Sequence, residues 1–172
     1  LLLEELRVSR IEIASARVSQ GEQQAVRAVA EWAAAKGYAD RVEALGFIDG
    51  GLSLDWLGAA GCRVVNLLAK GSRRHCEGQL RRTPEQHLAD VRAEILAAVD
   101  RHMRVNLYLE DWSNGMRHSP GYVYAMLDGL ADGIWIDAPG FSEESIREIE
   151  LMILQAARVR FSRTEYIACP SC

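Results

Sequence analysis

Two cysteines separated by two residues, Cys169 and Cys172, lie in the segment EYIACPSC. Thiols at this spacing can ligate a metal or a metal cluster, or remain free. Cys62 and Cys76 lie far from the pair along the chain and do not complete a known zinc signature with it. The four cysteines therefore indicate free thiols or metal ligands rather than a disulfide framework.

A second group of polar side chains lies within or directly after segments that we predict to be strands. It contains carboxylates, an arginine, a lysine and a histidine: Glu12, Arg17, Asp49, Lys70, His75, Glu110, Asp111 and Asp137. Catalytic residues of parallel α/β folds lie at the carboxyl ends of strands, so this set predicts a site for an anionic substrate assisted by a metal. The alternative is an ordinary solvated rim, because loops at strand ends are polar by default.

The elements that must position these residues alternate in character. Short runs rich in β-branched and apolar residues predict strands at 10–15, 41–47, 63–71, 104–111, 133–140 and 163–170. Apolar residues at helical spacing predict helices at 21–37, 53–61, 83–102, 121–131 and 142–159, and 112–121 reads as a loop. This alternation predicts an α/β fold with a parallel sheet of about six strands, either open or a partial (β/α)₈ barrel.

The helix at 83–102 has the clearest start. Thr83 is placed to cap it and Pro84 occupies its first position. His87 and His102, on this helix and at its end, are predicted to be surface residues rather than ligands. Cys62 is predicted to be a small buried hydrophobic residue, and Trp112 is the tryptophan we place at a site.

Charge and hydropathy exclude several classes of function. The 172 residues carry a net charge of −4, which gives no electrostatic footprint for nucleic acid or for an anionic membrane. The apolar runs are short and interrupted by charge, so neither a signal peptide nor a membrane span is expected. A soluble, cytoplasmic protein without nucleic-acid or membrane partners is the prediction.

Residues 1–127 resemble the DRE-TIM metallolyases, the family of 2-isopropylmalate synthase, homocitrate synthase and hydroxymethylglutaryl-CoA lyase. The resemblance rests on IEIASARVSQGE, RVVNLLAKGSRRHCEGQLRRTPEQHLADV and VNLYLEDWSNGMRHSP. It implies a (β/α)₈ barrel, a divalent metal, and a keto-acid or acyl-CoA substrate. By resemblance Glu12 is catalytic, and His75, Thr83, Glu110 and Asp111 bind substrate.

Two parts of the metallolyase site are missing from the sequence. The arginine–aspartate pair of the family's first strand has no counterpart, and none of the histidines forms an H-x-H pair. The resemblance therefore implies a chain that is inactive alone as a carbon–carbon synthase or lyase.

Residues from about 126 to 172 resemble a different family, the 4-hydroxy-3-methylbut-2-enyl diphosphate synthases of isoprenoid synthesis. The stretch LDGLADGIWIDAPG and the C-P-S-C of EYIACPSC carry this resemblance. It implies that Cys169 and Cys172 are two ligands of a [4Fe–4S] cluster whose other ligands come from elsewhere.

We therefore predict a metallolyase-like part at 1–127 joined to last barrel units at 128–172. Three functions remain open: an inactive piece of an acyl-CoA or keto-acid enzyme, part of the iron–sulfur diphosphate synthase, or a non-catalytic chimeric or designed scaffold. An incomplete barrel leaves sheet edges exposed, which predicts homo-oligomers formed through those edges.

Overall fold

The computed structural model describes the backbone of residues 10–134 and the side chains of residues 10–130. Within this range four parallel strands alternate with helices, in the spatial order β1-β2-β3-β4. The strands are β1 (Ile11–Ser15), β2 (Val42–Phe47), β3 (Val64–Lys70) and β4 (Arg104–Glu110). The predicted α/β class and the first four predicted strands are confirmed.

Six strands and a barrel are not observed in the described range. The predicted strand at 163–170 and most of that at 133–140 lie outside the described residues, as does the proposed second part at 128–172 beyond residue 134. The two residues that would have begun the fifth strand are helical instead, because α7 (Pro120–Ile134) extends past its predicted end at 131.

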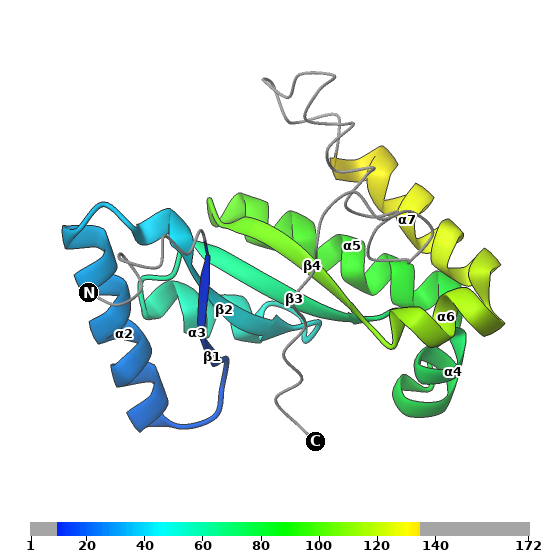
Figure 1. The fold of residues 1–172 in the computed structure, drawn as a ribbon, viewed down its shortest axis with the longest axis horizontal. Coiled ribbons are helices and arrows are strands. Elements are labelled where there is room, and N and C mark those ends of the chain that lie inside the picture. The colour runs from blue at the N-terminus through cyan, green and yellow to red at the C-terminus, as the bar shows by residue number, and fades with distance from the viewer. Residues whose placement is uncertain (1–9, 135–172) are drawn as a thin grey trace, which may run out of the picture. The chain divides into compact units, whose positions relative to one another are not determined.

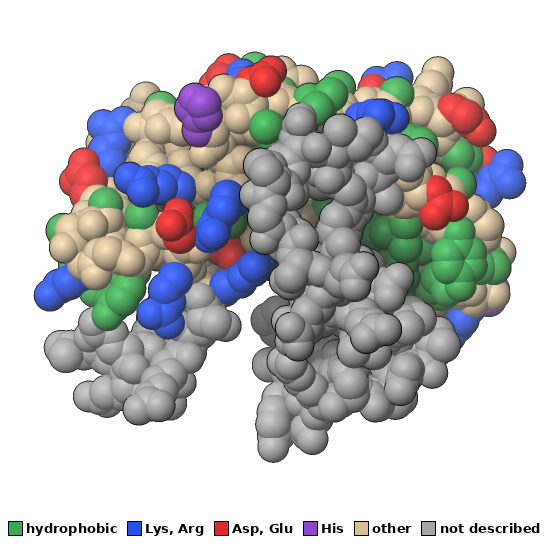
Figure 2. Space-filling view, turned by 90° about the horizontal axis from the view of Figure 1, so that it is seen from above, with side chains coloured by type: hydrophobic (Ala, Val, Ile, Leu, Met, Phe, Trp, Pro, Cys, Tyr) green, Lys and Arg blue, Asp and Glu red, His purple; other side chains and the backbone are tan. Residues whose placement is uncertain are grey.

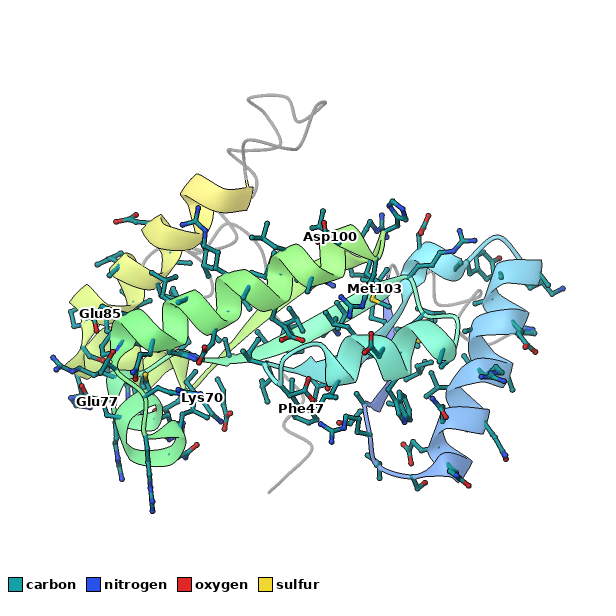
Figure 3. The ribbon with its side chains drawn as sticks, turned by 180° about the vertical axis from the view of Figure 1, so that it is seen from behind. Phe47, Lys70, Glu77, Glu85, Asp100 and Met103 are labelled. Carbon is teal, nitrogen blue, oxygen red and sulfur yellow. The ribbon has the colours of Figure 1, made fainter. Side chains whose placement is uncertain are left out.

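Helices cover one face of the sheet. In Figure 1 the strands lie in front of α3 (Leu52–Ala59) and α5 (Pro84–Asp100), and the reverse view in Figure 3 shows these helices in front of the strands. α2 (Gln20–Ala35) bonds to α3, since Arg27 donates a hydrogen bond to the carbonyl of Ala59. The alternating side chains Val65, Leu67 and Ala69 of β3 are fully buried in the resulting core.

Shorter helical elements flank the strands. A 3₁₀ turn, η1 (Ala39–Arg41), precedes β2; α4 (Arg73–His75) and the π-helical η2 (Cys76–Leu80) follow β3; and α6 (Trp112–His118) follows β4. α5 begins as predicted. Thr83 and Gln86 form a reciprocal capping box, and Pro84 takes the first position.

The helix α6 replaces the loop predicted at 112–121, and Gly115 explains the difference. A Cβ atom on Gly115 would lie 1.9 Å from the carbonyl oxygen of Gly71, the residue that follows β3. This glycine permits close contact between two backbones rather than a turn. A Ser-Asn-Gly run is typical of turns, so sequence alone favoured the wrong element.

The surface of the described part carries both signs of charge. Figure 2 shows Lys and Arg interspersed with Asp and Glu on the face seen from above. None of the described helices has the length and apolar character that crossing a membrane would require.

Candidate functional site

The carboxyl ends of β3 and β4 bring several predicted residues together. Lys70 and Glu110 occupy paired positions of the two strands, and their side chains form an ion pair. Asp111 follows directly and accepts a hydrogen bond from the Ser72 hydroxyl, with 2.7 Å between Oγ and Oδ2. Nε2 of His75 lies 3.4 Å from the same carboxylate oxygen. His75, Glu110 and Asp111 therefore share one edge of the sheet.

Asp111 is held as a carboxylate by its surroundings. Its φ of 66° lies in the left-handed region, which Asp and Asn tolerate better than most residues. Hydrogen bonds from Ser72 and Asn114 lower the pKa of its carboxyl, and His75 adds a smaller effect in the same direction. An ionised acceptor at a strand end suits a substrate hydroxyl or amine, or a cation.

The backbone of Lys70 is fixed from two helices. Its amide donates a hydrogen bond to Nε2 of His87, 3.0 Å away, and its carbonyl accepts one from the Tyr122 hydroxyl at 2.7 Å. His87 is only 1% exposed, so its predicted surface location is wrong. Burial lowers the pKa of its imidazole, which favours the neutral form that can accept this bond. His87 thus positions the strand end.

Trp112 begins α6 directly after Asp111, and its location at a functional site stays a prediction. It is partly buried against the core. Its Nε1 atom and Nδ1 of His75 are buried without a hydrogen-bond partner among the described residues. Cys62 is buried as predicted, and burial raises the pKa of its thiol to about 11.

Thr83 differs from the residues at the ends of β3 and β4 because its side chain caps a helix. Its hydroxyl accepts a hydrogen bond from the amide of Gln86 and so belongs to the helix cap. Its assignment as a substrate-binding residue stays a prediction.

Glu12 lies toward the opposite end of the strands. It is in register with Glu43, which pairs with Val64, which in turn pairs with Arg104 at the start of β4. Glu110 is six positions further along β4, or roughly 20 Å at the usual rise of a strand. The structure therefore separates Glu12 from the edge that holds His75 and Asp111, and its catalytic role stays a prediction.

Glu12 instead joins a polar network that the sequence analysis missed. Asn66, fully buried on β3, donates hydrogen bonds to Glu12 and to the hydroxyl of Tyr108, and accepts one from Asn106. These side chains lie on the sheet face opposite the buried Val65 and Leu67, as strand alternation requires. The available signal was an asparagine inside the apolar run VVNLLAK, aligned with the Asn of VNLYLE.

A salt bridge extends this network toward β2. Glu43 is 4% exposed, and its Oε1 lies 3.3 Å from Nε of Arg10 without a well-aligned hydrogen bond at that oxygen. Arg10 also donates a hydrogen bond to Asn106. Burial, and then the negative charges of Glu12 and Glu43, raise the pKa of Tyr108.

The strand-end residues near β2 are occupied in structural contacts. Asp49 pairs with Arg17 at 2.9 Å and accepts hydrogen bonds from the amide and hydroxyl of Ser53. Burial acts to raise its pKa, but these bonds outweigh burial and lower it. Glu94, 3% exposed on α5, accepts the amide hydrogens of Gly50 and Gly51, whose φ values are positive. These contacts stabilise the loop that follows β2.

Metal ligands are the last part of the prediction. Among the side chains of residues 10–130, no group of three or more His, Cys, Asp or Glu is arranged to hold a metal ion. Cys169, Cys172 and Asp137 lie outside the described residues.

Comparison with known proteins finds relatives that match short stretches of the chain. No protein-family profile matches the chain. A stretch of 47 residues, 27% of the chain, is 45% identical to 4-hydroxy-3-methylbut-2-en-1-yl diphosphate synthase (flavodoxin) of Protochlamydia amoebophila, of which it covers 7%. A stretch of 56 residues, 32% of the chain, is 39% identical to the chloroplastic ferredoxin-type enzyme of Arabidopsis thaliana, covering 8%.

The third relative is matched over a longer stretch. It is the flavodoxin-type synthase of Bacteroides fragilis, 41% identical over 68 residues, or 38% of the chain and 11% of the relative. The chain thus matches only about a tenth of the length of these relatives. The matches are consistent with the resemblance described for residues 126–172. They lend no support to the metallolyase resemblance of residues 1–127, or to its divalent metal, both of which stay predictions.

Proposed function

We propose that this chain is part of an iron–sulfur enzyme of isoprenoid synthesis similar to 4-hydroxy-3-methylbut-2-en-1-yl diphosphate synthase. The observation that carries the proposal is the identity of 39–45% between stretches of this chain and synthases of that name from a bacterium and a plant. A carbon–carbon synthase or lyase has no comparable support.

In this proposal Cys169 and Cys172 supply two thiolates to a [4Fe–4S] cluster. Thiolates are the donors that such clusters require, and the spacing of the pair fits adjacent irons of one cluster. Four ligands are needed, so the cluster requires two more besides this pair. When bound, the cluster would supply single electrons to the reaction; the relatives' names specify flavodoxin or ferredoxin, so a small electron-carrier protein is the reductant we propose.

The described part would contribute polar groups that bind the substrate. Lys70, whose backbone is fixed by His87 and Tyr122, holds its ammonium group at the carboxyl edge of the sheet. Asp111 remains ionised at the same edge and can accept a proton-bearing group of the substrate. These residues hold and orient a ligand.

Anaerobic incubation of the full chain with iron, sulfide and excess dithiothreitol tests the cluster. Dithiothreitol can supply the outstanding thiolates, so a brown chromophore with absorbance near 400 nm is expected in the unmodified chain. The double variant Cys169→Ser/Cys172→Ser should lose it, whereas Cys62→Ser, which alters a buried thiol, should keep it. Equal iron and sulfide binding by the double variant, or none by the unmodified chain, would contradict the proposal.

A further inference from the structure

The carboxyl end of β3 is held to α5 by a bond between a side chain and the backbone. Nε2 of His87 accepts the amide hydrogen of Lys70 across 3.0 Å. The last residue of β2, Phe47, pairs with Leu68, so Lys70 lies two residues beyond the pairing of β3 with that strand. The histidine thus supplies an acceptor at the point where β2 has ended.

This bond requires the neutral ring. A ring nitrogen that accepts a hydrogen bond carries no proton, so the neutral imidazole of His87 has its proton on Nδ1. Protonation would add an N–H group at Nε2, which faces the N–H group of Lys70. Two donors cannot share a hydrogen bond, so the bond depends on the protonation state of the ring.

The groups around His87 set that state. Lys70 from β3, Asp90 from the next turn of α5 and Arg82 from the segment before α5 border one cavity of about 390 Å³ with the ring. Burial lowers the pKa of the imidazole below 6.5; Asp90 opposes this effect and the ammonium group of Lys70 adds to it. The ring is therefore neutral near pH 7 and takes up its proton as the pH falls through the lowered value.

Lys70 has other bonds that do not involve the imidazole. Its carbonyl accepts a hydrogen bond from the Tyr122 hydroxyl of α7 at 2.7 Å, and its ammonium group pairs with Glu110 of β4. Both can persist when the ring is charged, so only the attachment to α5 is lost. Figure 3 shows Lys70 at the same end of the helix–sheet layer as Glu85, which marks the start of α5, and away from Asp100 at its end.

We propose that His87 is a pH-sensitive positioning residue, whose neutral ring fixes the carboxyl end of β3 and whose protonation frees the amide of Lys70. Through Lys70 it acts on the edge that carries Glu110 and Asp111. The proposal rests on β3 and α5 and not on the cysteine pair, so it and the proposed cluster can fail independently.

Nuclear magnetic resonance of the full chain between pH 8 and pH 4.5 tests the proposal. Long-range proton–nitrogen spectra report the tautomer and titration midpoint of His87, and the amide resonance of Lys70 is followed in the same samples. We expect a proton on Nδ1 at pH 8, a ring midpoint below 6.5, and an amide shift with the same midpoint. Protection of this amide against hydrogen exchange should fall roughly tenfold or more, whereas that of Leu67 in the middle of β3 should persist.

Three results would overturn the proposal. The first is a proton on Nε2 at pH 8, which would exclude the bond to Lys70. The second is a Lys70 amide that does not follow the ring, and the third is a ring that stays neutral until the whole chain unfolds.

Variants with a matched control separate this role from burial alone. His87→Gln keeps an acceptor but cannot titrate in this range, so the amide of Lys70 should lose its pH dependence. His118→Gln changes an exposed histidine of α6 and should leave that dependence intact. A full pH dependence of the Lys70 amide in His87→Gln would overturn the proposal.

Asp90→Asn tests the coupling without altering the ring. It removes a carboxylate that favours the charged imidazole, so the midpoint of His87 should move to lower pH. The midpoint of the Lys70 amide should move with it by the same amount. A shift of the ring midpoint alone would overturn the proposal.

Discussion

Asn66 is the residue on which the polar face of the sheet depends. It is fully buried and bonds to Glu12, Asn106 and Tyr108 on two other strands. Asn66→Ala removes a fully buried side chain together with its three hydrogen bonds, so the free energy of unfolding should fall by about 1–3 kcal/mol. Urea unfolding followed by circular dichroism measures the loss.

Asn114→Ala is the matched control. This asparagine also donates a side-chain hydrogen bond, to Asp111, but it is exposed. Its replacement should change stability by about 0.5 kcal/mol or less. Similar losses in the two variants would show that burial of the Asn66 network adds nothing.

Asp111 predicts a specific pH dependence. Hydrogen bonds from Ser72 and Asn114 lower its pKa in the folded chain below the ordinary value of 3.8. The stabilisation is therefore fully present above that ordinary value and is lost as the pH falls through the lower folded value. Asp111→Asn keeps a residue that tolerates positive φ but removes the titrating group. Unfolding free energies between pH 2 and 6 should show a shallower acid slope in the variant; identical slopes would contradict the prediction.

Among the elements, α6 depends on Gly115. Gly115→Ala would place a methyl group 1.9 Å from the backbone oxygen of Gly71, so either the helix or the strand end must move. The expected loss of stability is about 1–3 kcal/mol or more. Thermal or urea unfolding of the variant provides the measurement.

Gly121, on α7, supplies the comparison. A Cβ atom there meets nothing within 4 Å, so Gly121→Ala should be neutral or stabilising by up to about 1 kcal/mol. If Gly115→Ala behaved like Gly121→Ala, the close backbone contact would not limit the stability of this edge.

Elements governed by local rules were predictable from the sequence. The capping box at Thr83, the Pro84 start of α5 and the first four strands each follow from neighbouring residues. α6 did not, because the reason for Gly115 lies at Gly71, 44 positions away. The burial of His87 was missed for the same reason, since its partner is the backbone of Lys70.

The candidate site likewise contains residues that could be predicted from the sequence and residues that could not. Position at a strand end correctly grouped His75, Glu110 and Asp111, because parallel strands share an edge. The same argument, together with a sequence resemblance, wrongly placed Glu12 in this group, and only the strand register shows that it lies near the other end. The network around Asn66 needs three strands in register, which no single segment reveals.

At the scale of the whole molecule, β1 and β4 are the outer strands of the described sheet, and homo-oligomer formation through sheet edges stays a prediction. Unpaired edges favour association, which should increase with concentration. Sedimentation velocity of the full chain over a hundredfold concentration range measures it. One unchanged monomeric species throughout would contradict the prediction.

The contact of Gly71 with Gly115 has a consequence for how this edge responds to a ligand. Two backbones that touch leave no side chain whose rotation could absorb a displacement. The segment after β3, which carries Ser72, and the segment after β4, which carries Asp111, are therefore expected to move together. A ligand that displaced either segment would therefore be expected to displace the other as well.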